Sequence, residues 1–366
     1  PDLLCEFIRL LRFYIDKGVR VLRLDAVGFL WKQSGTSCLH LDETHELIKL
    51  IRTLIYHLDD TIWLITETNV PAHENLEYFG NGNEAHLIYN FSLPPLLVHA
   101  LLTGRSTFLR RWMMTAAPTP EGCTIFNFSA SHDGIGLRPV EGLLPEDELT
   151  RMTDTVKRFG GRLTMRSYGD REVPYEMNTT LFSALKGTVD GVDAHQIDRF
   201  LASQTIMMSL EGIPAFYVQS FLASENDAAR AEKTGRNRSL NRSQWQAADI
   251  DAQLAAGDTP MAQIFTEMRR RLAIRKQQKA FHPDATQFTL HIKKGMFGFW
   301  RQSLDRQQSL FVVTNITAQT KSLSLRDMNL FNDANWVDLL SGAPVHPDDE
   351  ELELAPYQTV WITNQS

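Results

Sequence analysis

The sequence predicts an α/β protein whose parallel β-sheet is followed by a small antiparallel β domain. One observation concerns the chain up to about residue 280, where short apolar runs alternate with amphipathic helical segments, the order that is typical of a parallel sheet with crossover helices. The other is a change of period. After Phe281 apolar residues recur at every second position, as in strands with one buried face.

Composition narrows the class of protein. With 366 residues, 43% apolar and 22% charged, the chain is typical of a globular protein with one large and one small domain. A net charge of -7 argues against a nucleic-acid partner, because such proteins usually carry a basic stripe. No apolar run reaches the roughly 18 residues of a membrane span. The three scattered cysteines favour reduced thiols and a cytoplasmic location.

The first predicted strand, with the apolar residues Val19, Val21, Leu22 and Leu24, follows an amphipathic helix and ends on Asp25. Because it carries few polar interruptions, we expect it to be buried on both faces. Arg23 lies two residues before Asp25, so both side chains point the same way. The next predicted elements are a helix ending near Leu58, a strand at Thr61–Thr66 before Glu67, a strand at Ala85–Phe91, a helix opened by Pro94 and Pro95, a helix containing Phe108 and Trp112, and a strand at Cys123–Phe128 before His132 and Asp133.

Between residues 134 and 180 the alternation gives way to a polar excursion with one helical run, Glu146–Phe159. A connection of that length is usually a lid or binding loop, so we expect an inserted subdomain at 134–180. The remaining predicted elements are a helix at Gln196–Leu210, a strand at Ile213–Val218, a loop rich in Arg and Asn at 226–242, and a helix at Met261–Lys276. The predicted domains are therefore 1–280 and 281–366.

Three acids, Asp25, Glu67 and Asp133, each follow a predicted strand of the parallel sheet. In a barrel such strand ends converge on one mouth, where active sites are built. A structural ion pair explains any one of these acids equally well. Three in matching positions, with Arg23 and His132 beside them, favour a catalytic site.

Crowded carboxylates raise one another's pKa, so that one stays protonated while another is ionised. Cleavage of a glycosidic bond with retention of configuration needs one ionised and one protonated carboxylate, because one attacks the sugar and the other protonates the leaving oxygen. Arg23 favours an ionised Asp25 as nucleophile, and Glu67, with no cation beside it in sequence, is the better acid. Metal chemistry competes, but no His-x-x-x-His or Cys-x-x-Cys spacing supports it. We expect no metal and no cofactor.

Several motifs carry a resemblance to a known family. They are RLDAVGF at 23–29, YNFSLPP at 89–95, HDGIG at 132–136, NTT at 178–180 and SLNR at 239–242. Together they resemble the sucrose phosphorylase-like subfamily of glycoside hydrolase family 13, the α-amylase superfamily, over nearly the whole chain. The resemblance implies an α-amylase-type (β/α)8-barrel, a small insertion after its seventh strand and a C-terminal antiparallel, sandwich-like β domain. It also leads us to expect that the chain holds barrel strands four to eight of a longer protein.

The same resemblance implies roles for individual residues. Asp25 would be the nucleophile, Glu67 the acid/base and Asp133 the stabiliser of the transition state. Arg23 and His132 would assist them, and Arg242 matches an arginine that helps to hold the glucosyl unit. Phe29, Tyr175, Glu176 and Arg238 are further candidates for contact with substrate. The Arg- and Asn-rich loop is either a solvated surface or a set of guanidinium forks for phosphate or sugar hydroxyls.

The function implied is a retaining α-glucoside phosphorylase that moves glucose from sucrose, sucrose 6-phosphate or glucosylglycerate to phosphate. The alternatives are an α-glucosidase or transglucosidase, and a non-catalytic carbohydrate-binding fragment. Phe29, Thr68-Asn69 and Pro174-Tyr175-Glu176 depart from the sucrose phosphorylase pattern, which leaves the acceptor open. The expected partners are a small sugar and inorganic phosphate, without nucleic acid or membrane, and a homodimer is left open.

Overall fold

A computed structural model describes residues 2–328, 330, 335–346 and 348–364. The chain forms two compact units, one of Pro1–Phe91 with Ala117–Phe126, the other of Ser92–Ala116 with Asn127–Ser366. Strand β4 (Thr124–Phe128) is shared between the two, and its last two residues belong to the second unit together with β10 (Ile213–Ala215). The strand order is β1-β2-β3-β4-β10. Each unit is described by itself.

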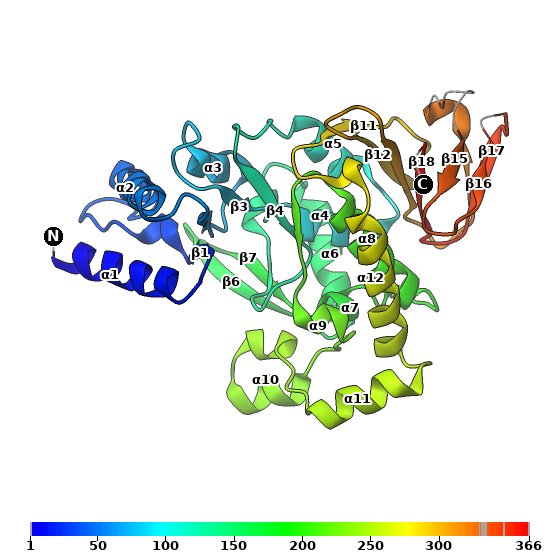
Figure 1. The fold of residues 1–366 in the computed structure, drawn as a ribbon. Helices are drawn as coiled ribbons and strands as arrows, with labels where there is room; N and C mark the ends of the chain where they lie inside the picture. Colours follow the sequence, from blue (N-terminus) through cyan, green and yellow to red (C-terminus); the bar gives the residue numbers. More distant parts are fainter. Residues whose placement is uncertain (1, 329, 331–334, 347, 365–366) are drawn as a thin grey trace. The chain divides into compact units, whose positions relative to one another are not determined.

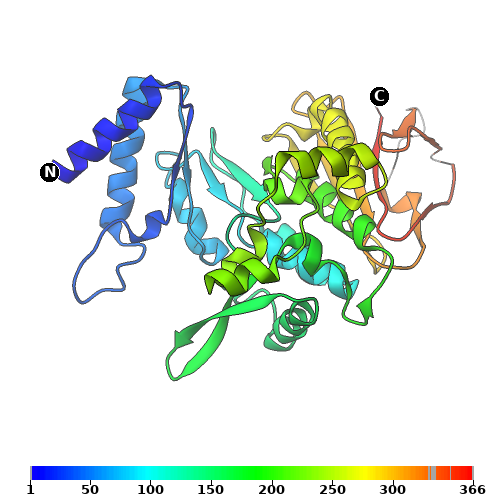
Figure 2. The ribbon, with the colours of Figure 1, turned by 90° about the horizontal axis from the view of Figure 1, so that it is seen from below.

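The first unit is a parallel sheet with helices, as the alternating pattern predicts. Its strands β1 (Val21–Leu24), β2 (Trp63–Thr66) and β3 (Leu87–Tyr89) pair in parallel with one another and with β4. The helices are α1 (Asp2–Asp16), α2 (Asp42–Leu58) and α3 (Ala72–Leu76). Ile48, Ile51 and Ile55 project from α2 into a core with Leu22 and Leu64, and Leu11 and Ile15 of α1 pack against that core. Figure 2 shows α1 and α2 at one end of the chain's colour range, in blue.

The expectation that the first strand is buried on both faces is wrong. Val21 is 45% exposed and Trp63, its partner in β2, is 46% exposed, whereas Leu22 and Leu64 are buried. Among the described residues β1 is the edge of the sheet, with β2 as its one neighbour. Because Trp63 belongs to β2, which has a neighbour on each side, the exposure of this pair reflects an uncovered part of one sheet face, and residue type alone does not show which part of a face is covered.

Helices dominate the second unit before residue 280. They include α4 (Leu93–Thr103), α5 (Thr107–Thr115), α8 (Gln196–Ser209) and α12 (Pro260–Lys276), close to the predicted ranges. Pro94 and Pro95 stand in the first turn of α4, where a missing amide hydrogen costs nothing. Thr259 caps α12 by accepting from the amide of Ala262. All residues of α4 from Leu93 to Leu102 are buried, so this helix is central to the unit's core.

The excursion at 134–180 contains more regular structure than its polar sequence suggests. Besides helix α6 (Glu146–Arg158), it forms a three-stranded antiparallel sheet in the order β5-β7-β6, from β5 (Ile135–Gly136), β6 (Arg162–Tyr168) and β7 (Arg171–Asn178). Figure 2 shows the β6–β7 hairpin extending beside α6. Both strands carry charged residues at irregular positions, and the register shifts between Thr164 and Met165, opposite Pro174. These features hide the alternation of apolar and polar residues by which a strand is predicted from sequence.

Beyond residue 281 the chain forms the predicted antiparallel structure. Six strands, in the order β11-β12-β13-β18-β15-β16, make one sheet and β14 pairs with β17 in another (Figure 1). Their bounds are β11 Thr286–Thr289, β12 Met296–Gln302, β13 Ser309–Asn315, β14 Lys321–Ser324, β15 Trp336–Asp338, β16 Pro344–Val345, β17 Glu351–Leu354 and β18 Thr359–Thr363. The domain boundary at 280/281 stays a prediction.

The remaining elements are short and lie between these. They are η1 Val27–Phe29, η2 Glu77–Phe79, η3 Arg138–Val140, α7 Leu181–Ala184, β8 Gly187–Thr188, β9 Gly191–Val192, α9 Val218–Phe221, α10 Ala228–Thr234, η4 Asn237–Asn241, α11 Ala247–Ala256, η5 Lys279–Phe281 and η6 Leu325–Met328. In the part of the chain described, no helix has the length and apolar character needed to cross a membrane.

His86 directly precedes β3, is hydrogen-bonded through its backbone to Leu64 of β2 and Thr124 of β4, and makes the stability of the first unit depend on pH. Its ring Nδ1 accepts from the amide of Leu64 at 2.9 Å, and burial, aided by the charge of Arg52, lowers the pKa of His86 to about 4. The unfolded value is about 6.5, so between these values the unfolded chain binds more protons. The contribution of His86 to stability is therefore present above pH 6.5 and is lost as the pH falls toward 4.

We expect His86→Gln to make the free energy of unfolding less dependent on pH between 6.5 and 4. Urea unfolding of the variant and the wild type at several pH values measures the difference, in which the titration of other groups cancels. His57→Gln, at an exposed position on α2, is the control. Parallel stability curves for His86→Gln and the wild type contradict the assignment.

Candidate active site

The end of β1 presents a charge pair. Arg23 Nη1 lies 2.7 Å from Asp25 Oδ1, and Arg23 Nε donates to the hydroxyl of Tyr89 at 3.0 Å. Burial tends to lower the pKa of Arg23, but Tyr89, Asp25 and Glu67 together outweigh it and raise that pKa. The side chain of Asp25 is 70% exposed. A carboxylate that is open to solvent on one side and held by a cation on the other suits a nucleophile.

Glu67 stands at the end of the neighbouring strand. The Glu67 amide donates to the carbonyl of Leu24, and its Oε2 accepts from the amide of Ala26 at 2.9 Å. Ala26 is left-handed, with φ of 47°, a conformation that costs a non-glycine residue about 1–2 kcal/mol. The turn therefore points the backbone amide of Ala26, the residue after Asp25, toward the carboxylate of Glu67. Asp25 and Glu67 thus follow two parallel strands that pair with each other.

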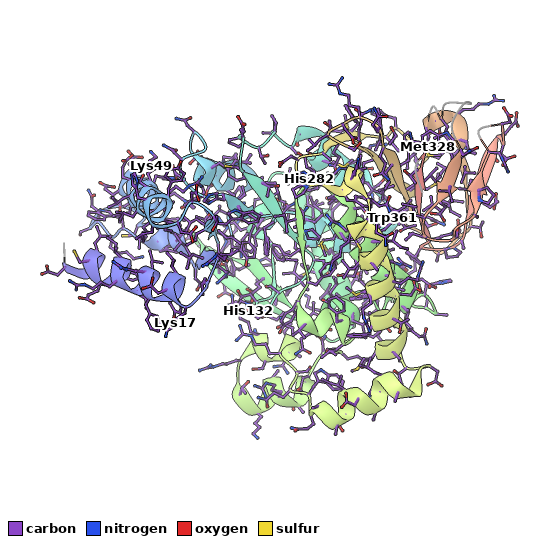
Figure 3. The ribbon with its side chains drawn as sticks, in the orientation of Figure 1. Lys17, Lys49, His132, His282, Met328 and Trp361 are labelled. Carbon is purple, nitrogen blue, oxygen red and sulfur yellow. The ribbon has the colours of Figure 1, made fainter. Side chains whose placement is uncertain are left out.

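In the second unit Asp133 is the centre of a polar cluster. It follows β4 in a turn where Ser131 Oγ accepts from the Asp133 amide at 3.1 Å. Asp133 Oδ1 accepts from Arg238 at 2.5 Å and lies 3.3 Å from Arg242 Nη2. Oδ2 lies 3.6 Å from the ring of His132, which is labelled in Figure 3. One carboxylate oxygen is thus bound by arginine, and the other faces the histidine.

Arg238 joins Asp133 to a second carboxylate. Its Nε and Nη2 donate to the two oxygens of Glu176 at 3.1 and 2.7 Å. The side chain of Glu176 is 2% exposed. The hydrogen bonds that Arg238 donates to Glu176 have the largest of the effects that raise the pKa of Arg238, followed by the charges of Glu176 and Asp133. A bidentate contact of this kind fixes the orientation of the guanidinium as well as pairing its charge.

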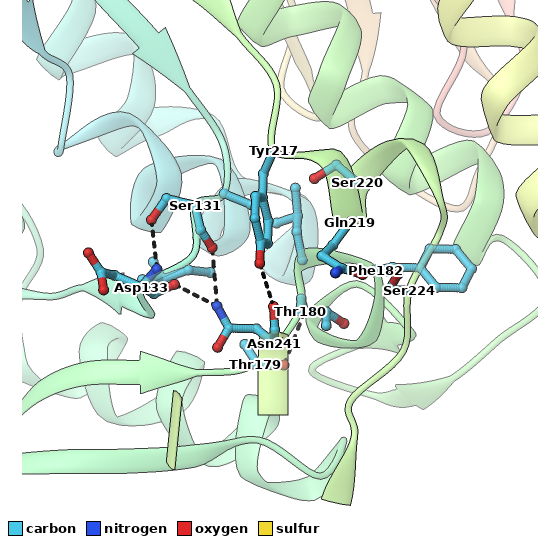
Figure 4. A pocket seen from close by; sticks show the side chains of 13 residues that line it. Ser131, Asp133, Thr179, Thr180, Phe182, Tyr217, Gln219, Ser220, Ser224 and Asn241 are labelled. Carbon is cyan, nitrogen blue, oxygen red and sulfur yellow. Dashed lines mark hydrogen bonds between the residues drawn. The ribbon is translucent and has the colours of Figure 1, made fainter. Parts of the chain in front are cut away.

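Asn241 lies beside Asp133, and Tyr217 lies beside Asn241, as Figure 4 shows. Asn241 Nδ2 donates to the carbonyls of Ser131 and Asp133 at 3.1 and 2.7 Å, and Tyr217 Oη donates to the carbonyl of Asn241 at 3.0 Å. Burial raises the pKa of Tyr217. A cavity in the second unit is lined by these residues and by Thr179 and Thr180. The turn that carries Asp133 is therefore held through its backbone as well as its side chain.

The predicted site residues fall into two groups, one in each unit. Arg23, Asp25 and Glu67 lie together in the first unit. Phe29, in the turn η1 that follows, is 49% exposed, with the Lys32 ammonium 4.8 Å from its ring centre. His132, Asp133, Glu176, Arg238 and Arg242 lie together in the second unit, where the carbonyl of Tyr175, in the strand that carries Glu176, accepts from the amide of Leu137.

Sequence reasoning missed Tyr89 and Asn241 as members of these groups. Tyr89 ends β3 beside the arginine of β1, and Asn241 precedes Arg242. Both stand within motifs quoted above, so their position was a signal, but their partners lie 66 and 108 residues away. Among the described residues no group of three or more His, Cys, Asp or Glu side chains could hold a metal ion.

Gly134 allows β7 to approach the turn of Asp133. A Cβ atom at this position would lie 2.4 Å from Glu176 Cγ and 2.6 Å from the carbonyl oxygen of Met177. The second contact is with backbone, so a rotamer change does not relieve it. We expect Gly134→Ala to lower the free energy of unfolding by about 1–3 kcal/mol, as overpacking does. Urea denaturation measures this loss of stability. An unchanged midpoint contradicts the close approach of β7 to the turn at Gly134.

No family model matches the chain, but curated proteins and solved structures do. It is 35% identical to the glucosylglycerate phosphorylase of Spirochaeta thermophila over 99% of its own length and 63% of the relative's, and 36% identical to that of Escherichia coli with the same coverage. It is also 27% identical to the sucrose phosphorylase of Agrobacterium vitis over 70% of this chain and 50% of the relative. The chain thus spans about 63% of the length of the first two relatives.

Among solved structures, the sucrose 6F-phosphate phosphorylase of Thermoanaerobacter thermosaccharolyticum matches with a TM-score of 0.72 at 20% identity, over 95% of this chain and 62% of that one. AmyP in complex with maltose matches with a TM-score of 0.68 at 12% identity, over 100% and 68%. At such identities the likeness concerns the fold. It confirms the predicted fold class, with its parallel strands and C-terminal antiparallel sheet.

Proposed function

The chain belongs to the sucrose phosphorylase-like group of glycoside hydrolase family 13, and from this premise we propose that it is the greater part of a retaining α-glucoside phosphorylase. The observation that carries the proposal is the pair of acids at the ends of β1 and β2, with a guanidinium 2.7 Å from Asp25 and a backbone amide 2.9 Å from Glu67. Two carboxylates in different surroundings are what a double displacement requires.

In the first step Asp25 attacks the anomeric carbon of an α-glucoside. The bond to the acceptor oxygen breaks, that oxygen takes the proton of Glu67, and a β-glucosyl ester of Asp25 remains. In the second step a phosphate oxygen attacks the same carbon and loses its proton to Glu67, which releases Asp25 and gives α-glucose 1-phosphate. Each displacement inverts the anomeric carbon, so the product retains the α configuration.

Asp133 is proposed to hold sugar hydroxyls. Oδ1 is engaged by Arg238 and Arg242, whereas among the described residues Oδ2 has only His132 nearby, at 3.6 Å. Oδ2 is therefore the oxygen available to accept from a hydroxyl. A carboxylate fixed in advance by two arginines does not reorganise as charge develops on the sugar, which favours the transition state.

Glu176 acts through Arg238 in this proposal. Both its oxygens are occupied by Arg238 and its side chain is almost fully buried, so its contribution is to hold the guanidinium that holds Asp133. Arg242 Nη2 lies 3.3 Å from the same oxygen of Asp133 that Arg238 contacts, and Arg242 Nε donates to the carbonyl of His132 at 2.6 Å. Phe29 and Tyr175 stay candidates for contact with the sugar or the acceptor.

The donor is proposed to be glucosylglycerate or a related α-glucoside such as sucrose or sucrose 6-phosphate. The relatives named glucosylglycerate phosphorylases are 35–36% identical to the chain, and those named sucrose phosphorylases are 27–28% identical. Glycerate is an anion and fructose is neutral, so the two acceptors differ in the charge that the site must accommodate.

We expect the whole protein to release α-glucose 1-phosphate from glucosylglycerate only when phosphate is present. Glucose and glucose 1-phosphate are assayed separately, with and without phosphate, and with sucrose as a parallel donor. Phosphorolysis makes the rate of donor consumption rise with phosphate concentration. Free glucose released at one rate in both conditions rejects phosphorolysis in favour of hydrolysis.

We expect Asp25→Asn to lower kcat by on the order of 10⁴-fold or more, because an amide cannot form the glycosyl ester. Asp60→Asn is a matched control, since Asp60 is an exposed carboxylate before β2, at the opposite end of that strand. Circular dichroism melting shows whether both variants fold. A well-folded Asp25→Asn protein with wild-type turnover contradicts the nucleophile assignment.

A further inference from the structure

An open hollow with a volume of about 360 Å³ lies between α10 and η4 in the second unit. Four arginines and two hydroxyl residues line it: Arg230, Thr234, Arg236, Arg238, Ser239 and Arg242. No carboxylate is among them. Its size falls in the range of small-molecule sites, about 300–1,000 Å³, and its donors are all groups that bind oxyanions.

The charges of these four arginines are only partly balanced. Arg238 and Arg242 face the carboxylates of Glu176 and Asp133, two cations against two anions. In the described part of the chain, no carboxylate oxygen lies within 4.0 Å of the guanidinium nitrogens of Arg230 or Arg236. These two arginines leave an excess of positive charge in the hollow.

The acids nearest in sequence have other partners. Asp227 caps α10 by accepting from the backbone amide of Arg230 at 2.9 Å, and Glu232 lies 3.8 Å from Arg162. In addition, Arg230 Nε is buried without a hydrogen-bond partner among the described residues. A buried donor in that state costs free energy unless a ligand or water satisfies it. A purely solvated surface, one of the two interpretations of this loop, does not bury a guanidinium nitrogen.

The backbone that carries the arginines is firmly held. Gly235, with φ of +66°, ends α10 and turns the chain, and Thr234 Oγ1 and Ser239 Oγ are 2.7 Å apart. The amide of Arg236 donates to Thr234 Oγ1 at 3.3 Å, and the amide of Ser239 to the carbonyl of Arg236 at 3.0 Å. Because the segment is already ordered, a ligand bound there loses less of its affinity to ordering the loop.

We propose that Arg230 and Arg236 form an oxyanion subsite beside Asp133, which binds the charged group of the glucosyl acceptor. The shared chemistry is that of a compact anion with two or more oxygens, either inorganic phosphate or the carboxylate of an acceptor acid. The inference rests on the proposed function, because Asp133 would then hold the sugar. Arg238 and Arg242 connect the two sites, since both line the hollow and both contact Asp133.

The test compares Arg230→Gln and Arg236→Gln with wild type in the whole protein, under three conditions: phosphorolysis with varied phosphate, and the reverse reaction from glucose 1-phosphate with either glycerate or fructose varied. We expect the KM of one anionic reactant to rise about tenfold or more in both variants, with kcat within about threefold. A phosphate subsite raises the KM of phosphate; a carboxylate subsite raises that of glycerate. Fructose, which is neutral, keeps its KM.

Arg269→Gln is the control for lost positive charge, because Arg269 is exposed on α12 and its guanidinium packs over the ring of Phe265. Unchanged KM values for both phosphate and glycerate in both variants overturn the proposal. Calorimetric titration of the Asp25→Asn protein with inorganic phosphate and with glycerate, with and without Arg236→Gln, separates this result from a failure of the proposed function. If Arg236→Gln weakens the binding of either anion in that titration, the subsite stands even if the wild type does not catalyse phosphorolysis. Equal affinity for both anions with and without the substitution overturns it.

Discussion

The cluster around Asp133 depends on one contact, the fork of Arg238 on Glu176. A carboxylate that is almost fully buried needs a counter-charge and filled hydrogen bonds, and Arg238 supplies both at 2.7 and 3.1 Å. Because the remaining nitrogen of the same guanidinium reaches Asp133, burial of Glu176 sets the position of Asp133. Three segments, the turn after β4, strand β7 and the turn η4, are thereby tied through a single side chain.

The acids of the first unit are held by a different device. There the backbone supplies the donor, since the left-handed Ala26 turns its amide toward Glu67 while Arg23 pairs with Asp25. In each unit, therefore, hydrogen-bond donors hold a carboxylate from one side: Arg23 holds Asp25 in the first unit, and Arg238 holds Asp133 in the second. Donors held in advance by the fold do not have to reorganise during a reaction, so both groups are suited to chemistry as well as to stability.

The sequence was sufficient for the strand-end acids, because a carboxylate that follows a short apolar run is a local feature, as Asp25 and Glu67 illustrate. It was not sufficient for partners that the fold brings from afar: Arg238 and Glu176 are 62 residues apart, and Arg23 and Tyr89 are 66. The hairpin of β6 and β7 was hidden by charged residues and a shift of register. Val21 and its partner Trp63 are both exposed, because this part of the sheet face is uncovered, and residue type does not encode that.

Net charge does not decide what such a protein binds at short range. The chain carries -7 overall, yet exposed charges more than about 8–10 Å away are largely screened at physiological salt. The lining of the hollow beside η4 carries four arginines, and among the described residues Arg238 and Arg242 are the two of them that pair with acids. A compact excess of guanidinium groups favours one small anion, whereas a nucleic acid needs an extended basic stripe. An acidic protein can therefore disfavour polyanions and still bind phosphate or a carboxylate.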